Sequence, residues 1–343
     1  MKKTILFIIL SVLLAGGGIF YYYYDQIYEP IISTSIENRE LKIKSGSTLE
    51  DVLFQLKQNN QLVKEKGFRW LASKMNYTDN TIKPGRYLLK PGMKNIDLVR
   101  LLRSGNQTPV KIVIYEGRTP DEIIKKAEED IEPGTEELLD TLYSEFFLAQ
   151  IGKIKDNAMT IFIPNTYEVY WNISAKNFLL KMKQEADKFW DRENRKVRAK
   201  LKGLTTDEVY TIASIVEKET NHSTERPIIA GVYLNRLKKG MRLEADPTVV
   251  FAKKAFKLQR VKYTDLAFKS PYNTYLNDGL PPGPISIASI ESIESVLSAP
   301  DHDYIFFCAK PGYTGQHNFA ATLGQHNANA RKFHEWMNEQ EIK

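Results

Sequence analysis

The chain has 343 residues, of which 42% are hydrophobic and 26% are charged. This is an ordinary globular composition, and it excludes a disordered, collagen-like or coiled-coil chain. The net charge of +6 is spread along the sequence without a basic block, so we expect no nucleic-acid partner. A single cysteine, Cys308, excludes an intrachain disulfide.

The N-terminal segment has the pattern of a membrane span. Residues 4–24 carry no charge and are long enough, as a helix, to cross a hydrocarbon core of about 30 Å. Two lysines precede this run and two acids follow it, which predicts a cytoplasmic N-terminus and a periplasmic remainder. We therefore predict a single-pass anchor in the inner membrane over 1–25 and a linker over 26–38. The alternative is a signal peptide cleaved near Leu14-Ala15-Gly16.

One pattern recurs in the first third of the chain: an apolar strand, a glycine, a capping residue and an amphipathic helix. It occurs over 41–56, 87–102 and 110–127. In the first copy, Ser47 and Glu50 are spaced as a capping box. No GxGxxG motif follows a strand, so the pattern predicts a small α+β module, over 39–106, in place of a parallel dinucleotide-binding sheet.

The remaining residues, 107–343, are predicted to form one larger α+β domain. Within it, the charged stretch over 176–202 is predicted to be one helix with a solvated face. Another helix begins after Thr205, which with Glu208 has capping-box spacing. A third helix is predicted over 225–239, where Asn235 either reaches a groove or is solvated.

The helix after Thr205 carries the strongest candidate for chemistry. In a helical projection, Glu219 lies about 50° from the centre of the apolar stripe, whereas Glu217 lies about 110° away and faces water. A carboxyl on a buried stripe loses hydration, and this raises its pKa, as a general acid requires near neutral pH. The alternative is a core glutamate neutralised by Arg226 or Arg236.

Three later loops are rich in aromatic, amide, proline and glycine residues, which suits a sugar-binding cleft, although each alone is also typical of a turn. They span 242–248, 270–275 and 279–285. The five histidines lack metal-ligand spacing, so we expect neither a metal nor a cofactor.

The order and spacing of these motifs resemble those of the YceG-like endolytic murein transglycosylases, the MltG family. The matching segments are 212–220, 223–226, 232–237, 240–243, 246–249, 272–275, 279–285, 315–319 and 326–327. The resemblance extends over nearly the whole chain and includes a LysM-like module with Gly85-Arg86-Tyr87. One departure is Asn165, where the family pattern suggests Asp, and a charge-dependent role there is in doubt.

The resemblance implies an endolytic lyase that cuts the β-1,4 bond between N-acetylmuramic acid and N-acetylglucosamine in nascent glycan strands. It implies 1,6-anhydro ends, action near the membrane as a terminator of glycan elongation, and Glu219 as the catalytic acid and base. The implied sugar-positioning residues are Asn235, Asp246, Tyr272, Asn273, Thr274, Gly279, Pro281, Pro282 and His317. The implied partners are peptidoglycan, the membrane and glycan-polymerising synthases.

Two other classes of function remain open. A hydrolytic glycosidase requires a second carboxylate, for which Glu225, Glu244 and Asp246 are the candidates. A non-catalytic wall-binding protein would use the module over 39–106 and carry Glu219 as a buried structural acid. Product analysis separates the first class, because hydrolysis leaves a reducing end and transglycosylation does not.

Overall fold

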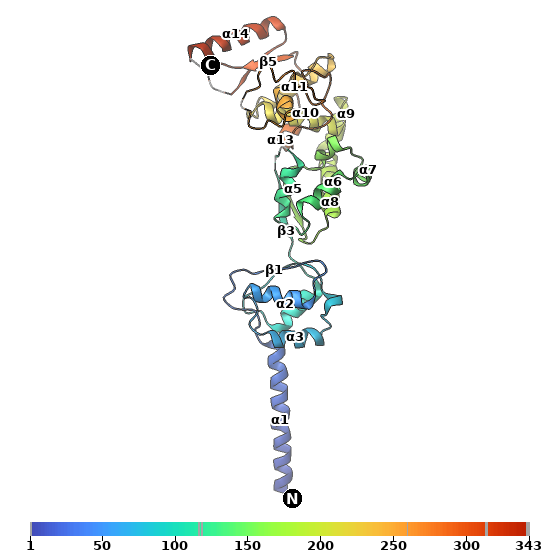
Figure 1. The fold of residues 1–343 in the computed structure, drawn as a ribbon, viewed down its shortest axis with the longest axis vertical. Helices are drawn as coiled ribbons and strands as arrows, with labels where there is room; N and C mark the ends of the chain where they lie inside the picture. The colour runs from blue at the N-terminus through green and yellow to red at the C-terminus, as the bar shows by residue number, and fades with distance from the viewer. Residues whose placement is uncertain (1, 116, 118, 259, 313–314, 341–343) are drawn as a thin grey trace. The chain divides into compact units, whose positions relative to one another are not determined.

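The computed structural model describes residues 2–115, 117, 119–258, 260–312 and 315–340 (Figure 1). The chain divides into two compact units. The first takes the residues up to Lys111 together with Asp130–Pro133 and Glu168–Ser174; the second takes Ile112–Glu129, Gly134–Tyr167 and the residues from Ala175 onward. The predicted mixture of helices and strands is confirmed.

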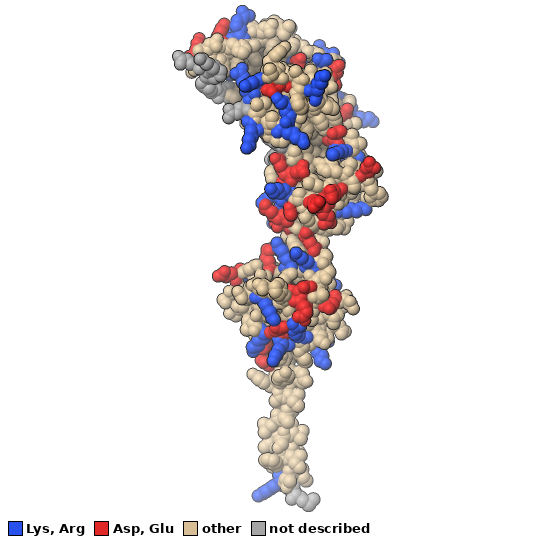
Figure 2. All heavy atoms as spheres, in the orientation of Figure 1, with Lys and Arg blue, Asp and Glu red and all other residues tan. Residues whose placement is uncertain are grey.

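The chain begins with the helix α1 (Lys2–Tyr28), which is long and apolar enough to cross a membrane. The side chains of its apolar stretch are exposed, and Figure 2 shows no charged group along the greater part of the helix. At 1.5 Å per residue, its 27 residues extend for about 40 Å. These findings suggest the predicted membrane anchor, and the helix continues three residues past the predicted end.

Residues 26–38 do not form the predicted linker but belong to the fold of the first unit. Ile31 and Ile32 are each 1% exposed. An isolated bridge pairs Ile32 with Leu62. The apolar side chains of this segment complete the core of the first unit, so it is held in place and does not span freely between anchor and module.

The first unit combines short helices with a two-stranded sheet. Its elements are β1 (Glu40–Ile43), α2 (Leu49–Gln58), α3 (Glu65–Lys74), the 3-10 turn η1 (Asp79–Thr81), β2 (Gly85–Leu88) and α4 (Asn95–Ser104). β1 and β2 are antiparallel, with Leu41 opposite Tyr87, and both side chains enter the core. The similarity of this unit to LysM stays a prediction.

The capping box of α2 lies one residue later than predicted. The hydroxyl of Thr48 accepts a hydrogen bond from the backbone N–H of Asp51, whose carboxylate accepts one from the N–H of Thr48. Ser47 and Glu50 have the same spacing, but the helix begins at Leu49, so Thr48 takes the N-cap position. Val52, Leu53 and Leu56 of this helix are buried.

The next part of the chain contains short elements. They are β3 (Val110–Ile114), α5 (Pro120–Glu128), α6 (Thr135–Tyr143), α7 (Glu145–Ile151), η2 (Lys155–Ile161) and β4 (Asn165–Val169). β3 and β4 form a two-stranded sheet. The third predicted strand and helix are present, although residues 116 and 118 between them lie outside the described residues. Asn165 is exposed, and its side-chain oxygen accepts from the N–H of Thr166.

The prediction of a single helix over 176–202 is wrong. The chain forms α8 (Ala175–Asp191), the 3-10 turn η3 (Arg192–Asn194) and α9 (Arg195–Leu201). Glu193 and Asn194 have φ angles of 54° and 53°, which break the helix. After this break, Arg195 is buried and pairs with Glu294, so part of the charged stretch serves the core instead of facing water.

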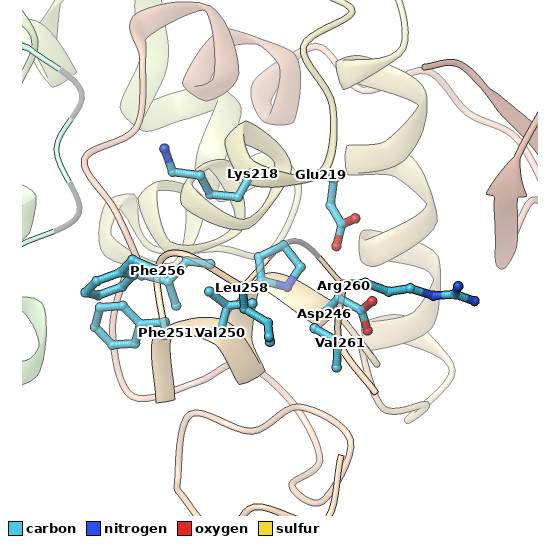
Figure 3. A pocket seen from close by; sticks show the side chains of 11 residues that line it. Lys218, Glu219, Asp246, Val250, Phe251, Phe256, Leu258, Arg260 and Val261 are labelled. Atoms are coloured by element: carbon cyan, nitrogen blue, oxygen red, sulfur yellow. The ribbon is translucent and has the colours of Figure 1, made fainter. Parts of the chain in front are cut away.

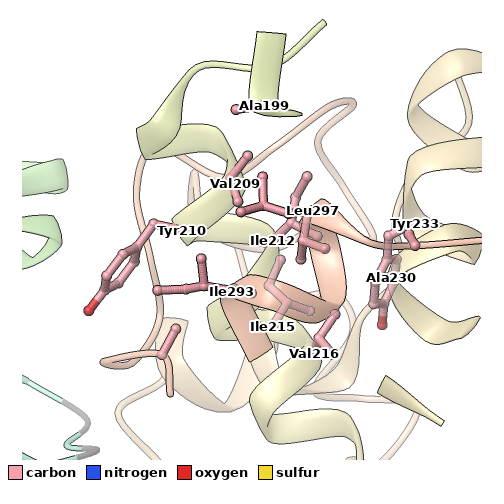
Figure 4. Close-up of a cluster of buried hydrophobic side chains, with 14 of the residues drawn as sticks. Ala199, Val209, Tyr210, Ile212, Ile215, Val216, Ala230, Tyr233, Ile293 and Leu297 are labelled. Carbon is pink, nitrogen blue, oxygen red and sulfur yellow. The ribbon is translucent and has the colours of Figure 1, made fainter. Parts of the chain in front are cut away.

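The second unit is organised around α10 (Thr206–Glu219), which begins with the predicted capping box of Thr205 and Glu208. Around it lie α11 (Arg226–Lys238), α12 (Asp246–Ala252) and α13 (Ile290–Leu297), followed by β5 (Phe306–Ala309), β6 (His317–Ala320) and α14 (Leu323–Glu339). β5 and β6 are antiparallel. Figure 4 shows side chains that meet in this core, including Val209, Ile212, Ile215, Val216, Ala230, Tyr233, Ile293 and Leu297.

The burial of residues 26–38 generates a prediction about truncation. A protein lacking residues 1–24 should remain folded, whereas removal of 1–38 should destabilise the first unit by about 3 kcal/mol or more. The reason is that burial of one isoleucine contributes about 1.5–3 kcal/mol, and both Ile31 and Ile32 are lost. Urea unfolding followed by circular dichroism measures the difference, and equal midpoints for the two proteins would contradict it.

Candidate active site

Glu219 is the last residue of α10, where the buried helix reaches the wall of a cleft. Its Oε1 accepts a hydrogen bond of 2.6 Å from the hydroxyl of Tyr233, which lies on α11. Tyr233 is 1% exposed, and its ring makes an edge contact with Phe307 of β5. Three elements of the second unit thus hold the carboxyl in place.

The surroundings of Glu219 raise its pKa to about 7. Loss of hydration is the main cause, and the negative charge of Asp246 adds to it. The hydrogen bond from Tyr233 and the positive charge of Arg236 act in the opposite direction but do not cancel the effect. A carboxyl with this pKa exchanges a proton near neutral pH, which suits both an acid and a base.

The prediction that Glu217 faces water is wrong. Its side chain is 12% exposed, and its carboxylate accepts hydrogen bonds from the hydroxyls of Ser289 and Ser292. Arg226 lies 3.5 Å away. Burial alone would raise the pKa of Glu217, but these hydroxyls and the charge of Arg226 hold it below its ordinary value. Glu217, and not Glu219, is therefore the core glutamate neutralised by an arginine.

Two pockets share Glu219 and Asp246 in their walls, so these acids lie where the pockets adjoin. The first pocket has a volume of about 310 Å³ and the second about 470 Å³. The first is also lined by Lys218, Pro247, Val250, Phe251, Phe256, Leu258, Arg260, Val261 and Ile285. The second is also lined by Arg236, Leu243, Glu244, Tyr275, Phe306, Phe307, Leu323, His326 and Asn327.

Asp246 is the first residue of α12, and Figure 3 shows its carboxyl on the same side of the first pocket as that of Glu219. Its Oδ1 accepts a hydrogen bond of 2.7 Å from the hydroxyl of Tyr275. Each acid of the pair is thus held by one tyrosine. Of the predicted sugar-positioning residues, Asp246 is the one that shares these pockets with Glu219.

Asn273 and Thr274 are buried, and their polar atoms bind the protein itself. The amide of Asn273 donates to the carbonyls of Leu266 and Phe268 and its oxygen accepts from the N–H of Tyr275. The hydroxyl of Thr274 accepts from the N–H of Ala245. In this structure both residues shape the loop that carries Tyr275 and do not line the pockets.

The other predicted positioning residues do not line the two pockets, although the rings of Tyr272 and His317 pack against Phe251 and Phe307 in the pocket walls. Asn235 donates to the carbonyls of His302 and Tyr304, and Tyr272 donates to Asp156. Nδ1 of His317 lies 3.0 Å from the carboxylate of Glu225. Gly279, Pro281 and Pro282 line a different pocket, together with Thr205 and Asp207. Whether any of these residues touches a substrate stays a prediction.

The sequence analysis missed the roles of Tyr233 and Tyr275. Each lies inside a segment that carries the family resemblance, but a tyrosine in an apolar run gives no sign of which acid it will meet. Pairing depends on how α10, α11 and the loop after α12 pack together. Within the described part of the chain, no group of three or more His, Cys, Asp or Glu residues is arranged to hold a metal.

The sequence matches the model of a known protein family. The model of the YceG-like family matches residues 41–332, which is most of the chain. This protein therefore belongs to the YceG-like family, as the motifs predicted.

Two named relatives and one crystal structure support the same family assignment. A Bacillus subtilis (strain 168) protein named endolytic murein transglycosylase is 30% identical over 329 residues, which cover 91% of this chain and 89% of the relative. A Streptococcus pneumoniae protein with that name is 29% identical over 82% of this chain, but the match spans only 56% of the relative. A 2.6 Å crystal structure of a putative yceG-like protein from Listeria monocytogenes has 30% identity and a TM-score of 0.55, and the match covers 84% of this chain and 97% of that one.

The contacts of Glu217 predict a structural role. Glu217→Gln should destabilise the protein at neutral pH by about 1–3 kcal/mol, because a buried arginine and two hydroxyls lose a charged acceptor. Since the folded-state pKa of Glu217 is lowered, the difference should be present above the ordinary glutamate pKa and disappear as the pH falls through the lowered value. Denaturant unfolding at several pH values measures it. The control Glu335→Gln changes an exposed acid on α14 and should have little effect.

The hydrogen bond from Tyr233 predicts a shift in the pH profile. Tyr233→Phe removes a donor that stabilises the charged carboxylate, so the pKa of Glu219 should rise above about 7. The alkaline limb of kcat/KM for glycan cleavage should then move to higher pH. Tyr210→Phe is the matched control, because Tyr210 is also fully buried but donates to the carbonyl of Phe162. Identical limbs in wild type and Tyr233→Phe would contradict the proposed coupling.

Proposed function

We propose that this protein is an endolytic lytic transglycosylase that cuts the bond between N-acetylmuramic acid and N-acetylglucosamine in peptidoglycan. The observation that carries the proposal is the carboxyl of Glu219, whose pKa is raised to about 7 at the boundary of two pockets. The names of the Bacillus and Streptococcus relatives support the same substrate and reaction.

In the proposed reaction, Glu219 acts first as an acid and then as a base. Its proton moves to the glycosidic oxygen as the bond from that oxygen to C1 of the muramyl residue breaks. The resulting carboxylate then takes the proton of the muramyl C6 hydroxyl, whose oxygen bonds to C1 and closes the 1,6-anhydro ring. Glu219 ends protonated, and neither water nor a protein nucleophile is consumed.

Asp246 is proposed to stabilise the positive charge that develops at C1 in the transition state. It shares both pockets with Glu219, and the hydroxyl of Tyr275 holds its carboxyl. The same position suits a base that activates water, so a hydrolytic glycosidase is the second candidate. The candidates differ in their products, which end in a 1,6-anhydro ring or in a reducing sugar.

Two adjoining pockets support an endolytic mode of action. A strand that lies in both pockets has sugars on each side of the acids, so it can be cut away from its ends. A role in terminating glycan elongation, and contact with glycan-polymerising synthases, follow from the family resemblance.

The proposed orientation places the catalytic unit outside the cytoplasm. Two lysines precede the apolar stretch of α1 and acids follow it, which favours a cytoplasmic N-terminus. A reporter that is active only outside the cytoplasm, fused after residue 30, should be active while the N-terminus of α1 is retained. A mature protein that begins near Gly16 would contradict the membrane anchor and support a cleaved signal peptide.

The substitution Glu219→Gln tests the chemistry. It retains the shape of the side chain but removes the transferable proton, so release of anhydro-muropeptides should fall by about 10²- to 10⁴-fold. Mass spectrometry of digested peptidoglycan identifies the product ends, and circular dichroism checks the fold. Near-normal turnover by Glu219→Gln would exclude it as the acid, and reducing ends from the wild type would favour the hydrolase.

A further inference from the structure

The two pockets beside Glu219 and Asp246 differ in charge. Apart from the shared acids, the first pocket is lined by two cationic residues, Lys218 and Arg260, and by no further acid. The second contains Arg236 and the opposing Glu244. The first pocket is therefore the one suited to an anionic group.

The single arginine of the second pocket is committed to the protein. Arg236 is 7% exposed and donates to the carbonyls of Leu243 and Ile305 and to the carboxylate of Glu244, at 2.7 to 3.0 Å. Burial and the charge of Arg236 lower the pKa of His326, so the charged form of this imidazole is disfavoured. The second pocket thus suits a neutral sugar.

The wall of the first pocket is largely apolar away from the acids. Figure 3 shows Phe251 and Phe256 on one side of the pocket, with Arg260 on the side of Glu219 and Asp246. Arg260 is exposed. A ligand in this pocket therefore meets aromatic and aliphatic surface inside it, and Figure 3 shows the guanidinium of Arg260 at the edge of the pocket, beyond the two acids. An accessible guanidinium binds carboxylates well.

The two sugars of the proposed substrate differ in charge, as the two pockets do. N-acetylglucosamine is neutral, whereas the muramyl residue bears a lactyl group that carries a peptide with free carboxylates and methyl side chains. We propose that the first pocket receives the muramyl residue with its peptide, and that Arg260 binds a peptide carboxylate. This inference rests on the proposed function and adds a specificity determinant to it.

The test compares two substrates that differ only in charge. One is a set of glycan strands with intact stem peptides, and the other is the same strands after conversion of the peptide carboxylates to primary amides with carbodiimide and ammonia. The wild type should have a kcat/KM about threefold to tenfold higher on the charged strands. This preference should shrink as salt is added, because salt screens an accessible ion pair.

Arg260→Gln should lower kcat/KM on the charged strands to the value for the amidated strands and leave the latter unchanged. Lys257→Gln is the matched control, since it removes an exposed charge of the same loop that does not line the pocket. It should retain the preference and its salt dependence. Circular dichroism should be the same for all three proteins.

Other outcomes overturn the inference in distinct ways. An equal loss on both substrates would mean that Arg260 acts on the catalytic acids or on the sugar instead of the peptide. If the wild type cleaved both substrates with the same kcat/KM, the peptide carboxylate would have no cationic binding site. If Arg260→Gln kept the preference for charged strands, a residue other than Arg260 would bind the carboxylate. If the wild type cleaved neither substrate while remaining folded, the proposed function itself would fail, and the inference with it.

Discussion

The burial of α10 is the constraint on which the site depends. Every residue from Val209 to Val216 is buried, and α11, α12 and α13 pack around the helix, so it cannot rotate or slide without disrupting the core. Its last residue, Glu219, is consequently held at the boundary of two pockets. The same packing removes water from the carboxyl and raises its pKa to about 7. The core therefore sets both the position and the protonation of the candidate acid.

Two acids that are two residues apart illustrate how surroundings assign roles. Both lose hydration, but Glu217 gains two hydroxyl donors and a nearby arginine, whereas Glu219 gains one tyrosine and faces the charge of Asp246. The pKa of the first falls and that of the second rises. The first is suited to holding α10 against α13, and the second to moving a proton.

Each of the two acids that the pockets share, Glu219 and Asp246, is paired with a tyrosine, and the loop before Tyr275 supports one of these pairs. Asn273 uses its amide to organise the loop that carries Tyr275, which in turn holds Asp246. Polar residues in such loops need not touch a substrate to affect its binding. The sequence motifs of the family thus include residues that line the pockets and residues that support those that do.

Local periodicity predicted that Glu219 turns toward the protein, because the sides of a helix repeat every 3.6 residues. The same periodicity wrongly placed Glu217 in water, because α10 is buried on all sides from Val209 to Val216. Capping residues likewise predicted the start of α10, and the apolar run predicted α1. The serine partners of Glu217 lie more than seventy positions later in the chain, and Asp246 meets Tyr275 across 29 positions. Only the packing of distant segments decides such contacts, since a sequence pattern records which side of an element is apolar but not which element will cover it.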